Sequence, residues 1–295
     1  MQEFGLRLTD NVFDLHDDLA HHTYRHGPYQ AFRVSDPKAR DIHKATVRDR
    51  LLHRALYRAL YPFFDRNFIA DSYSCRQGKG SHAALHRFRR FSYAVSRNGT
   101  RTCWVLKGDI RKCFASIDHG LLLNILRGYI RDGQLLNLLG EVVGSFASGT
   151  ESVGLPLGNI TSQLLANIYL NELDRFAKHA LRAKCYVRYG DDFVLLSDDR
   201  GWLEAQLPRI GEFLERQLRL ALHPGKVSIR ALASGVDFLG WVHFMDHRVL
   251  RTATKRRMLK RLRRGATNAS ITSYLGLLSH GNGYKLGEEV RRCEV

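Results

Sequence analysis

The sequence predicts an α+β fold built around a ferredoxin-like sheet, because residues 101–244 show the element order β-α-β-β-α-β. An apolar run at 101–110 has the pattern of a buried strand and carries Asp109 near its end. Two further apolar strands, 185–189 and 193–197, enclose the turn Gly190-Asp191-Asp192, which is a hairpin pattern. Amphipathic helical patterns separate these strands along the chain.

The residues before this sheet contain helices and one short strand. Residues 1–28 have a helical pattern with a poorly defined end, Gln30–Val34 is predicted to be a strand, and Asp36-Pro37 is a turn signal. From Thr46 to Phe64 the apolar residues recur at helical spacing. The opposite face of that helix carries Arg48, Arg50, Arg54 and Arg58. Two interpretations of this face stay open, a solvated basic face and a helix lying along a phosphate backbone.

The remaining elements follow in order along the chain. Helices are predicted at 121–130, 134–143, 160–179 and 202–220, a strand at 236–244, and a strongly basic helix at 254–264. Asn159 directly precedes the long helix at 160–179, and asparagine is a favoured N-cap residue. No repeat or linker interrupts the chain, so its subdomains are expected to pack closely.

Charge and composition narrow the function classes. The chain carries 46 lysines and arginines against 29 acidic residues, a formal charge of +17. This excess attracts polyanions, with nucleic acid as the leading partner and an acidic membrane surface as the alternative. No apolar run approaches the roughly 18 residues of a transmembrane helix, and residues 1–10 lack a signal-peptide pattern.

Cysteine and histidine usage points away from structural metals and disulfides. The five cysteines are scattered and form no CxxC pair, which argues against a zinc ribbon or disulfide framework and favours a reducing cytoplasm. The 14 histidines lack metal-ligand spacing, so surface or RNA-facing roles are favoured over a histidine metal site.

Three aspartates form the predicted chemical centre. In the split βαβ order, the strand that ends at Asp109 and the hairpin that carries Asp191 and Asp192 are neighbours, so their carboxylates should converge at one sheet edge. Clustered carboxylates repel one another unless a hard cation neutralises them, and oxygen ligands select magnesium or manganese over zinc. Two such ions roughly 3.5–4 Å apart can activate a 3′-hydroxyl and stabilise a pyrophosphate leaving group.

Phe114 stands shortly after Asp109, in the segment DIRKCF. If Asp109 binds the metal ions, this aromatic ring lies beneath the incoming sugar, where it excludes a 2′-hydroxyl and favours deoxynucleotides. The alternative is that Phe114 is an ordinary core residue.

Several motifs together resemble those of reverse transcriptases. The palm motifs of that family are matched, in order, by KGDIRKCFASIDH (107–119), GLPLGNITSQLLANIYLNELD (154–174), VRYGDDFVLLS (187–197) and FLGWVHF (238–244). Upstream, residues 47–85 resemble the fingers motifs of bacterial reverse transcriptases related to group II introns. The resemblance implies a right-hand polymerase with fingers, a ferredoxin-like palm and a small helical thumb.

On this resemblance the chain divides into three parts. Residues 1–98 are the fingers with an N-terminal extension, 99–244 the palm and 245–295 the thumb. Residues 121–160 are a helical insertion of the palm that contacts the fingers.

The resemblance also implies roles for individual residues. Asp109, Asp191 and Asp192 become the metal-binding catalytic triad, and Phe114 the sugar-selecting aromatic. Arg76, in SYSCRQGKG, becomes a partner of the nucleotide triphosphate, since the planar guanidinium binds phosphate oxygens bidentately.

Four lysines and arginines receive further assignments from the resemblance. Lys38 and Arg40 resemble the fingers hairpin, which reaches triphosphate or template. Lys79 is a candidate contact of template phosphate, with a plain surface lysine as the alternative. Lys226 matches the lysine that protonates the leaving pyrophosphate, and its alternative is a solvated turn lysine after Pro224-Gly225.

Two departures from the common pattern indicate a subtype. Leu157 stands where reverse transcriptases of the group II lineage usually have glutamine, and Gln163 stands where they usually have proline. An apolar side chain cannot make the hydrogen bond by which that glutamine helps to monitor base-pair geometry, so discrimination there should loosen. Gly-x-x-x-Ser-Gln at this position is typical of reverse transcriptases from diversity-generating retroelements.

Membership of that group implies a particular biology. The enzyme copies a template-repeat RNA into cDNA with frequent errors opposite adenines, using deoxynucleoside triphosphates, and the cDNA replaces a variable repeat in a target gene. Its expected partner is a small basic accessory variability determinant that forms a pentamer. The expected setting is the cytoplasm, with a bacterial or phage gene and no membrane association.

The C-terminal basic helix fits a thumb. Arg256, Arg257 and Lys260 are predicted to follow an RNA–DNA duplex by backbone contacts, above an apolar stripe that includes Met258 and Leu262. A membrane-lying helix is the alternative, disfavoured because the stripe is narrow and lacks tryptophan and phenylalanine.

Two rival functions stay open at this stage. A group II intron, retron or phage-defence reverse transcriptase would keep the chemistry and change the biology. A non-catalytic RNA-binding scaffold with a polymerase-like fold is the rival from another class, and the intact carboxylates and Lys226 argue against it.

Overall fold

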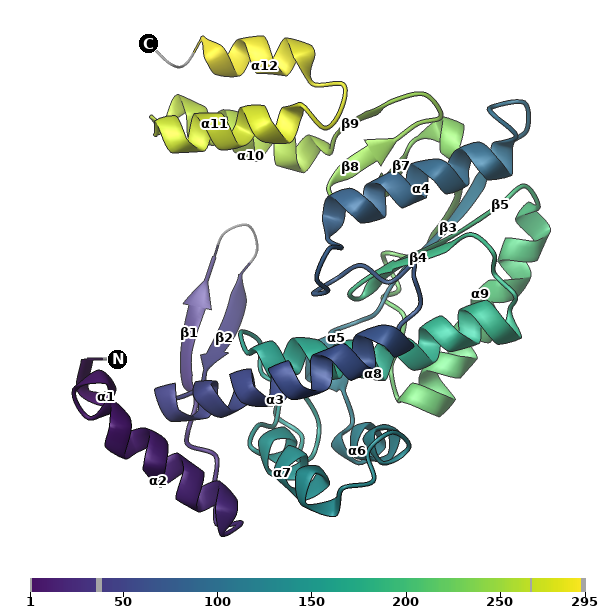
Figure 1. The fold of residues 1–295 in the computed structure, drawn as a ribbon. Coiled ribbons are helices and arrows are strands. Elements are labelled where there is room, and N and C mark those ends of the chain that lie inside the picture. Colours follow the sequence, from purple (N-terminus) through teal and green to yellow (C-terminus); the bar gives the residue numbers. More distant parts are fainter. Residues whose placement is uncertain (1, 36–38, 266, 293–295) are drawn as a thin grey trace.

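The structure of the chain is a computed structural model that describes residues 2–35, 39–265 and 267–292 (Figure 1). Its centre is a four-stranded antiparallel sheet of β3 (Trp104–Asp109), β4 (Tyr186–Tyr189), β5 (Asp192–Ser197) and β6 (Ser228–Ala231). The strands lie in the order β4-β5-β3-β6. Two helical connections and one tight hairpin join them, which makes the ferredoxin-like arrangement and confirms the predicted α+β class.

The fourth strand of this sheet was predicted in the wrong place. The expected strand at 236–244 belongs to a separate three-stranded sheet and is itself two strands, β7 (Val236–Phe238) and β8 (Trp241–His243), followed by β9 (Arg248–Leu250). The chain reverses at Leu239 and Gly240, whose φ angles are 50° and 86°. A left-handed leucine is rare, so the unbroken apolar pattern concealed the turn.

Both faces of the central sheet are buried, because its apolar residues alternate between two hydrophobic clusters. Phe193 and Leu195 of β5 enter one cluster, while Val194 and Leu196 enter the other. Successive side chains of a strand point to opposite faces, so a fully buried strand appears as a continuous apolar run. This explains why β5 is uniformly apolar from Phe193 to Leu196.

Helices cover the first face of the sheet. They are α3 (Val47–Asn67), the short α5 (Cys113–Ser116), α6 (His119–Arg127), α7 (Gly133–Gly144), α8 (Ile160–Arg175) and α9 (Arg200–Leu218). Twelve of the 16 residues of α8 are buried, so it is the central helix of this face, and its buried residues include the polar Asn167, Asn171 and Asp174. The helix predicted at 160–179 leaves α-helical geometry at Arg175 and continues as one π-helical turn, Phe176–Ala180.

The second face carries α4 (Ser81–Ser96), the β7-β8-β9 sheet and three C-terminal helices (Figure 1). These helices are α10 (Thr252–Arg263), α11 (Asn268–Leu278) and α12 (Tyr284–Arg291). Met258 and Leu262 are the buried residues of α10, as the apolar stripe predicted. No helix among the described residues is both long and apolar enough to span a bilayer.

The N-terminal region consists of α1 (Gln2–Leu6), α2 (Leu8–Ala20) and a hairpin of β1 (Gln30–Val34) and β2 (Arg40–Lys44). The predicted strand 30–34 is confirmed. The predicted turn at Asp36-Pro37 and Lys38 lie outside the described residues. In Figure 1 the hairpin stands apart from the central sheet and next to α3.

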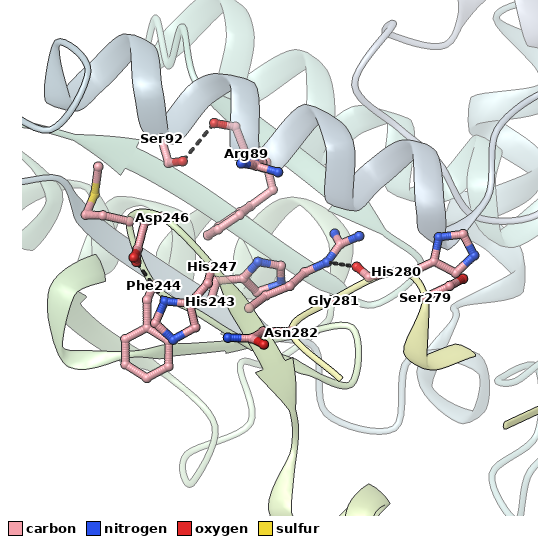
Figure 2. Close-up of a pocket in the computed structure, with 13 residues that line it drawn as sticks. Arg89, Ser92, His243, Phe244, Asp246, His247, Ser279, His280, Gly281 and Asn282 are labelled. Carbon is pink, nitrogen blue, oxygen red and sulfur yellow. Dashed lines mark hydrogen bonds and ion pairs between the residues drawn. The ribbon is translucent and has the colours of Figure 1, made fainter. Parts of the chain in front are cut away.

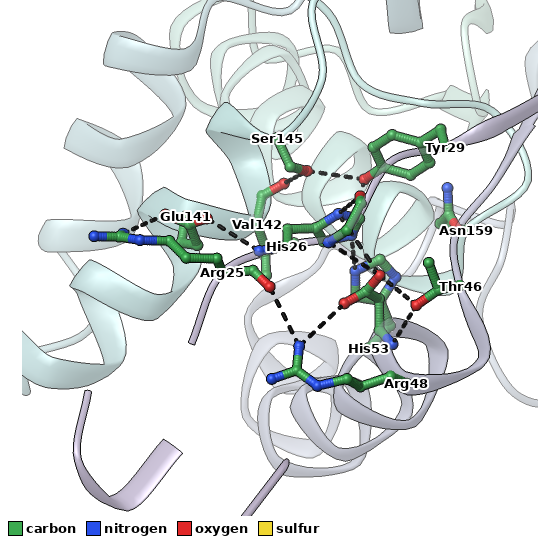
Figure 3. Close-up of polar contacts among 12 residues, drawn as sticks. Arg25, His26, Tyr29, Thr46, Arg48, His53, Glu141, Val142, Ser145 and Asn159 are labelled. Atoms are coloured by element: carbon green, nitrogen blue, oxygen red, sulfur yellow. Dashed lines mark hydrogen bonds and ion pairs between the residues drawn. The ribbon is translucent and has the colours of Figure 1, made fainter. Parts of the chain in front are cut away.

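A buried polar network fixes the segment that leads into this hairpin (Figure 3). The Asp49 carboxylate is fully buried and accepts hydrogen bonds from Tyr24 Oη (2.7 Å), Thr46 Oγ1 (2.6 Å) and the Gly27 backbone N–H (3.2 Å). These bonds hold the pKa of Asp49 below its usual value despite burial. A charged, fully bonded carboxylate therefore ties residues 24–27 to the first turn of α3.

Candidate active site

The central sheet brings the three predicted aspartates to one edge. Asp109 is the last residue of β3 and Asp192 the first of β5, and the antiparallel register pairs these two positions directly. Asp191 lies in the β4–β5 turn beside them, where its carbonyl accepts a 3.1 Å hydrogen bond from the Ile110 N–H. The expectation that the two strands are neighbours is confirmed.

Burial and mutual repulsion perturb these carboxyl groups. Burial raises the pKa of Asp191, and the nearby Asp109 adds to the increase. Burial likewise raises the pKa of Asp192 to about 6; Lys107 opposes the shift, whereas Asp191 and Asp109 reinforce it. Such raised values are the signature of clustered carboxylates that lack a full complement of positive charge.

Lys226 supplies part of that charge. Its Nζ donates to both oxygens of Asp109, at 2.9 Å each. The backbone supports this contact, because the His223 N–H donates to the Asp109 carbonyl at 2.7 Å and the Lys226 N–H to the His223 carbonyl at 3.0 Å. The predicted catalytic lysine therefore lies at the carboxylate edge.

As placed, the carboxylates do not form a closed metal site. In the described ranges, no group of three His, Cys, Asp or Glu side chains is close enough to hold an ion. The donor set nevertheless suits a hard cation, since it consists of oxygens only and the carboxyl pKa values of Asp191 and Asp192 are raised by burial and, to a smaller extent, by the neighbouring carboxylates. Lys226 is 41% exposed whereas Asp109 is 8% exposed, so the lysine can withdraw into solvent and leave the buried Asp109 oxygens to a cation.

A buried arginine, which sequence reasoning missed, supports the hairpin that carries Asp191 and Asp192. Arg188 of β4 is fully buried and donates from Nε and Nη2 to the two oxygens of Asp174, at 2.7 Å each. Its remaining bonds go to Asn167 Oδ1, Ser72 Oγ and the Gly190 carbonyl. Because Gly190 begins the aspartate turn, Arg188 links α8 to that turn. The available signal was a charged residue inside the otherwise apolar strand YVRY.

Close backbone packing also positions the aspartates. A Cβ atom added at Gly108, next to Asp109, would lie only 2.2 Å from Phe193 Cζ. The Phe193 ring therefore covers the Gly108 backbone where β3 and β5 pair, and a larger residue at 108 would push the two strands apart.

Several residues that were predicted to contact the incoming nucleotide lie around the loop before α8. The Leu157 carbonyl accepts a 2.9 Å hydrogen bond from the His43 N–H of β2, and Asn159 Nδ2 donates to the His43 carbonyl at 2.9 Å. These bonds dock the β1–β2 hairpin onto the loop. Asn159 occupies the N-cap position of α8 but makes no side-chain cap bond there, so the predicted cap interaction is replaced by this contact.

The other side chains of this group differ in exposure. Leu157 is half-buried, whereas Gln163 is exposed on the first turn of α8. Phe114 is half-buried and packs against the main hydrophobic cluster, so both of its interpretations remain compatible with its position. Arg40 is exposed, and its charge acts to lower the pKa of Asp191, which places β2 within electrostatic reach of the carboxylate edge.

Arg76 and Lys79 are engaged with the protein itself. The Arg76 side chain is 5% exposed and donates to the Asp65 side chain and to the carbonyls of Asp65, Ile69 and Ser72. Lys79 Nζ donates to the Ala70 carbonyl at 2.8 Å. A contact of either residue with nucleotide or template would have to replace these bonds, so their predicted roles stay predictions. Arg256, Arg257 and Lys260, by contrast, are exposed on α10.

The chain is similar in sequence to known polymerases. Residues 35–243 match the family described as "Reverse transcriptase (RNA-dependent DNA polymerase)". Protein YkfC of Escherichia coli is 29% identical and aligns over 84% of this chain and 74% of its own. The group II intron-encoded protein LtrA of Lactococcus lactis is 25% identical over 81% of this chain, which spans about half (49%) of LtrA.

Solved telomerase structures share the fold. Apo telomerase from Candida tropicalis, truncated from its C-terminal domain, superposes with a TM-score of 0.57 at 10% identity, over 78% of this chain and 55% of its own. Telomerase from Candida albicans in complex with a fragment of telomeric RNA gives a TM-score of 0.55 at 11% identity, over 81% and 50%. At such low identity the similarity establishes the fold alone, that of a right-hand polymerase.

Proposed function

The chain belongs to the reverse transcriptase (RNA-dependent DNA polymerase) family, and we propose that it copies RNA into DNA at the carboxylate edge formed by Asp109, Asp191 and Asp192. The supporting observation is the β3–β5 register, which pairs Asp109 with Asp192 next to Asp191. A binding scaffold has no use for clustered carboxyl groups of raised pKa where a phosphate substrate would lie.

The roles of the edge residues follow from their contacts. Asp109, Asp191 and Asp192 would hold divalent cations, magnesium or manganese, and such ions would supply the positive charge that neutralises the reacting phosphate and lowers the pKa of a 3′-hydroxyl. Lys226 holds Asp109 in place before substrate arrives. Once displaced, its ammonium group can donate a proton to the leaving pyrophosphate.

The surrounding residues receive the predicted binding roles. Phe114 selects deoxyribose, Leu157 and Gln163 border the nascent base pair, and Arg40 assists from β2. Lys38 and Arg76 remain candidates for triphosphate contact, and Lys79 for template contact. Arg256, Arg257 and Lys260 of α10 grip the RNA–DNA duplex, with residues 1–98, 99–244 and 245–295 as fingers, palm and thumb.

The proposal extends to the subtype. Leu157 cannot hydrogen-bond a nascent base pair, which supports low fidelity opposite adenine and hence mutagenic copying of a template-repeat RNA by a diversity-generating retroelement. The basic pentameric accessory protein remains the proposed partner. Similarity to LtrA keeps a group II intron-like function as the alternative.

Primer extension on a defined RNA template with magnesium, followed by cDNA sequencing, tests both the polymerase activity and the proposed subtype. Asp191→Asn and Asp192→Asn should abolish extension while RNA binding is retained, because Asn keeps the shape and removes the ligand charge. Asp198→Asn is the matched control, since Asp198 follows β5 and pairs with Arg101 on the surface. Wild-type extension by either active-edge variant would overturn the metal assignment.

The error pattern separates the subtypes. Errors concentrated opposite template adenines support the retroelement function, whereas accurate cDNA would leave a reverse transcriptase of the alternative kind. Leu157→Gln should lower misincorporation opposite adenine, with Leu51→Gln on the exposed side of α3 as control. An unchanged error rate in Leu157→Gln would mean that fidelity is determined elsewhere.

A further inference from the structure

A pocket away from the carboxylate edge has no assigned role. It encloses about 300 Å³ between α4, the turn that joins β8 to β9, and the loop that joins α11 to α12 (Figure 2). This volume lies at the lower end of the roughly 300–1,000 Å³ of small-ligand sites. None of the residues assigned above to metal, nucleotide or duplex binding lines it.

Two arginines line the pocket without an acidic partner. Within the described residues, neither Arg89 of α4 nor Arg248 of β9 forms an ion pair with a carboxylate; Arg89 Nη2 donates to Tyr93 Oη at 3.3 Å and Arg248 Nε to the His280 carbonyl at 2.5 Å. The carboxylate among the lining residues, Asp246, is 84% exposed and bonded to His247. The terminal nitrogens of Arg248 are therefore left for a ligand.

The two guanidinium groups lie close enough to repel each other. Burial and the charge of Arg89 together lower the pKa of Arg248. The rings of His82 and His280, 3.9 Å apart, lie alongside, and Arg248 acts on the pKa of His82 as well. Like charges that converge in a concave site stabilise an anion there, and the arginine fork matches the oxygens of phosphate.

We infer that this pocket binds a phosphate group of the nucleic-acid backbone, with Arg89 and Arg248 as its donors and Asn282 at its rim. A backbone phosphate is favoured because Arg248 lies four residues before α10, whose outer face is basic. Phe88 under the pocket and Met258 under α10 belong to the same hydrophobic cluster, so the pocket and the basic helix are built on one core. The identity of the polyanion rests on the proposed function.

Salt-dependent binding of an RNA–DNA duplex tests this inference. The double variant Arg89→Gln/Arg248→Gln should bind about tenfold more weakly at low salt, and the slope of log K against log salt should fall by about 1 for one lost phosphate contact. The charge-matched control is Arg90→Gln/Arg131→Gln, which removes two exposed arginines outside the pocket. Inorganic phosphate, titrated against the same proteins and observed by ³¹P NMR, is the second arm.

Each outcome decides one point. A double variant with the slope and affinity of the control would overturn the site. An unchanged slope with phosphate binding lost only in the double variant would transfer the site from the backbone to a free phosphate or nucleotide. If wild-type protein fails to extend a primer but the slope still falls in the double variant, the proposed polymerase function fails and the phosphate site stands.

Discussion

The fully buried Arg188–Asp174 pair makes a quantitative prediction about how the aspartate hairpin is held. Replacing Asp174 with Asn removes the charge while keeping the shape of the side chain. Asp174 accepts hydrogen bonds from Arg188 Nε, Arg188 Nη2 and Tyr186 Oη, each at 2.7 Å, and an amide oxygen cannot replace both carboxylate oxygens. Arg188 would then keep a buried charge without a counter-charge.

The expected cost follows from that uncompensated charge. Removing one partner of a buried ion pair typically lowers the free energy of unfolding by 3–5 kcal/mol. At roughly 2–4 °C per kcal/mol for a domain of about this size, the thermal midpoint should fall by at least about 6 °C. Urea unfolding followed by both fluorescence and circular dichroism measures the free energy, and agreement of the two probes validates a two-state treatment.

The control is an ion pair of similar length on the surface. Glu212→Gln breaks the 2.8 Å contact with Arg216, whose side chains are 58% and 73% exposed, and should cost under about 1 kcal/mol. Asp174→Asn should also slow primer extension, because Arg188 donates to the Gly190 carbonyl beside Asp191. An Asp174→Asn protein within about 1 kcal/mol of wild type would refute the view that this pair supports the hairpin.

Three further predictions follow from single contacts. Gly108→Ala should destabilise the fold by about 1–3 kcal/mol through its clash with Phe193, whereas Gly140→Ala on α7, with open space around it, should not; equal urea midpoints would contradict this. Asp192→Asn should stabilise the metal-free protein at pH 7 by about 2–3 kcal/mol but not at pH 4. The reason is that the raised pKa of Asp192, about 6, makes the free energy of unfolding of the wild-type protein fall as the pH rises from about 4 to 6, whereas asparagine does not titrate. Unfolding of both proteins in EDTA at the two pH values checks the sign. Asn159→Ala should cost about 1 kcal/mol and speed amide exchange at His43, since it removes the bond that docks β2; unchanged exchange would exclude that role.

Local patterns were sufficient to predict most elements of the fold and the catalytic edge. Periodicity placed β1, α3, α8, β4 and β5, because their apolar spacing matches the period of each structure. The β-α-β-β-α-β order then predicted that Asp109 and the Asp191-Asp192 turn lie on neighbouring strands. These are consequences of chain chemistry within a few residues and of a small number of allowed topologies.

Only the tertiary structure decided which charged groups are satisfied and which are free. Sequence cannot distinguish a clamped arginine from an available one: Arg76 is engaged by Asp65 and backbone carbonyls, whereas Arg89 and Arg248 meet in a pocket without an acidic partner among the described residues. The hairpin at Leu239-Gly240 and the Arg188–Asp174 pair were likewise hidden. In each case the outcome depends on contacts between residues distant along the chain, so burial and partner geometry, rather than local pattern, determine it.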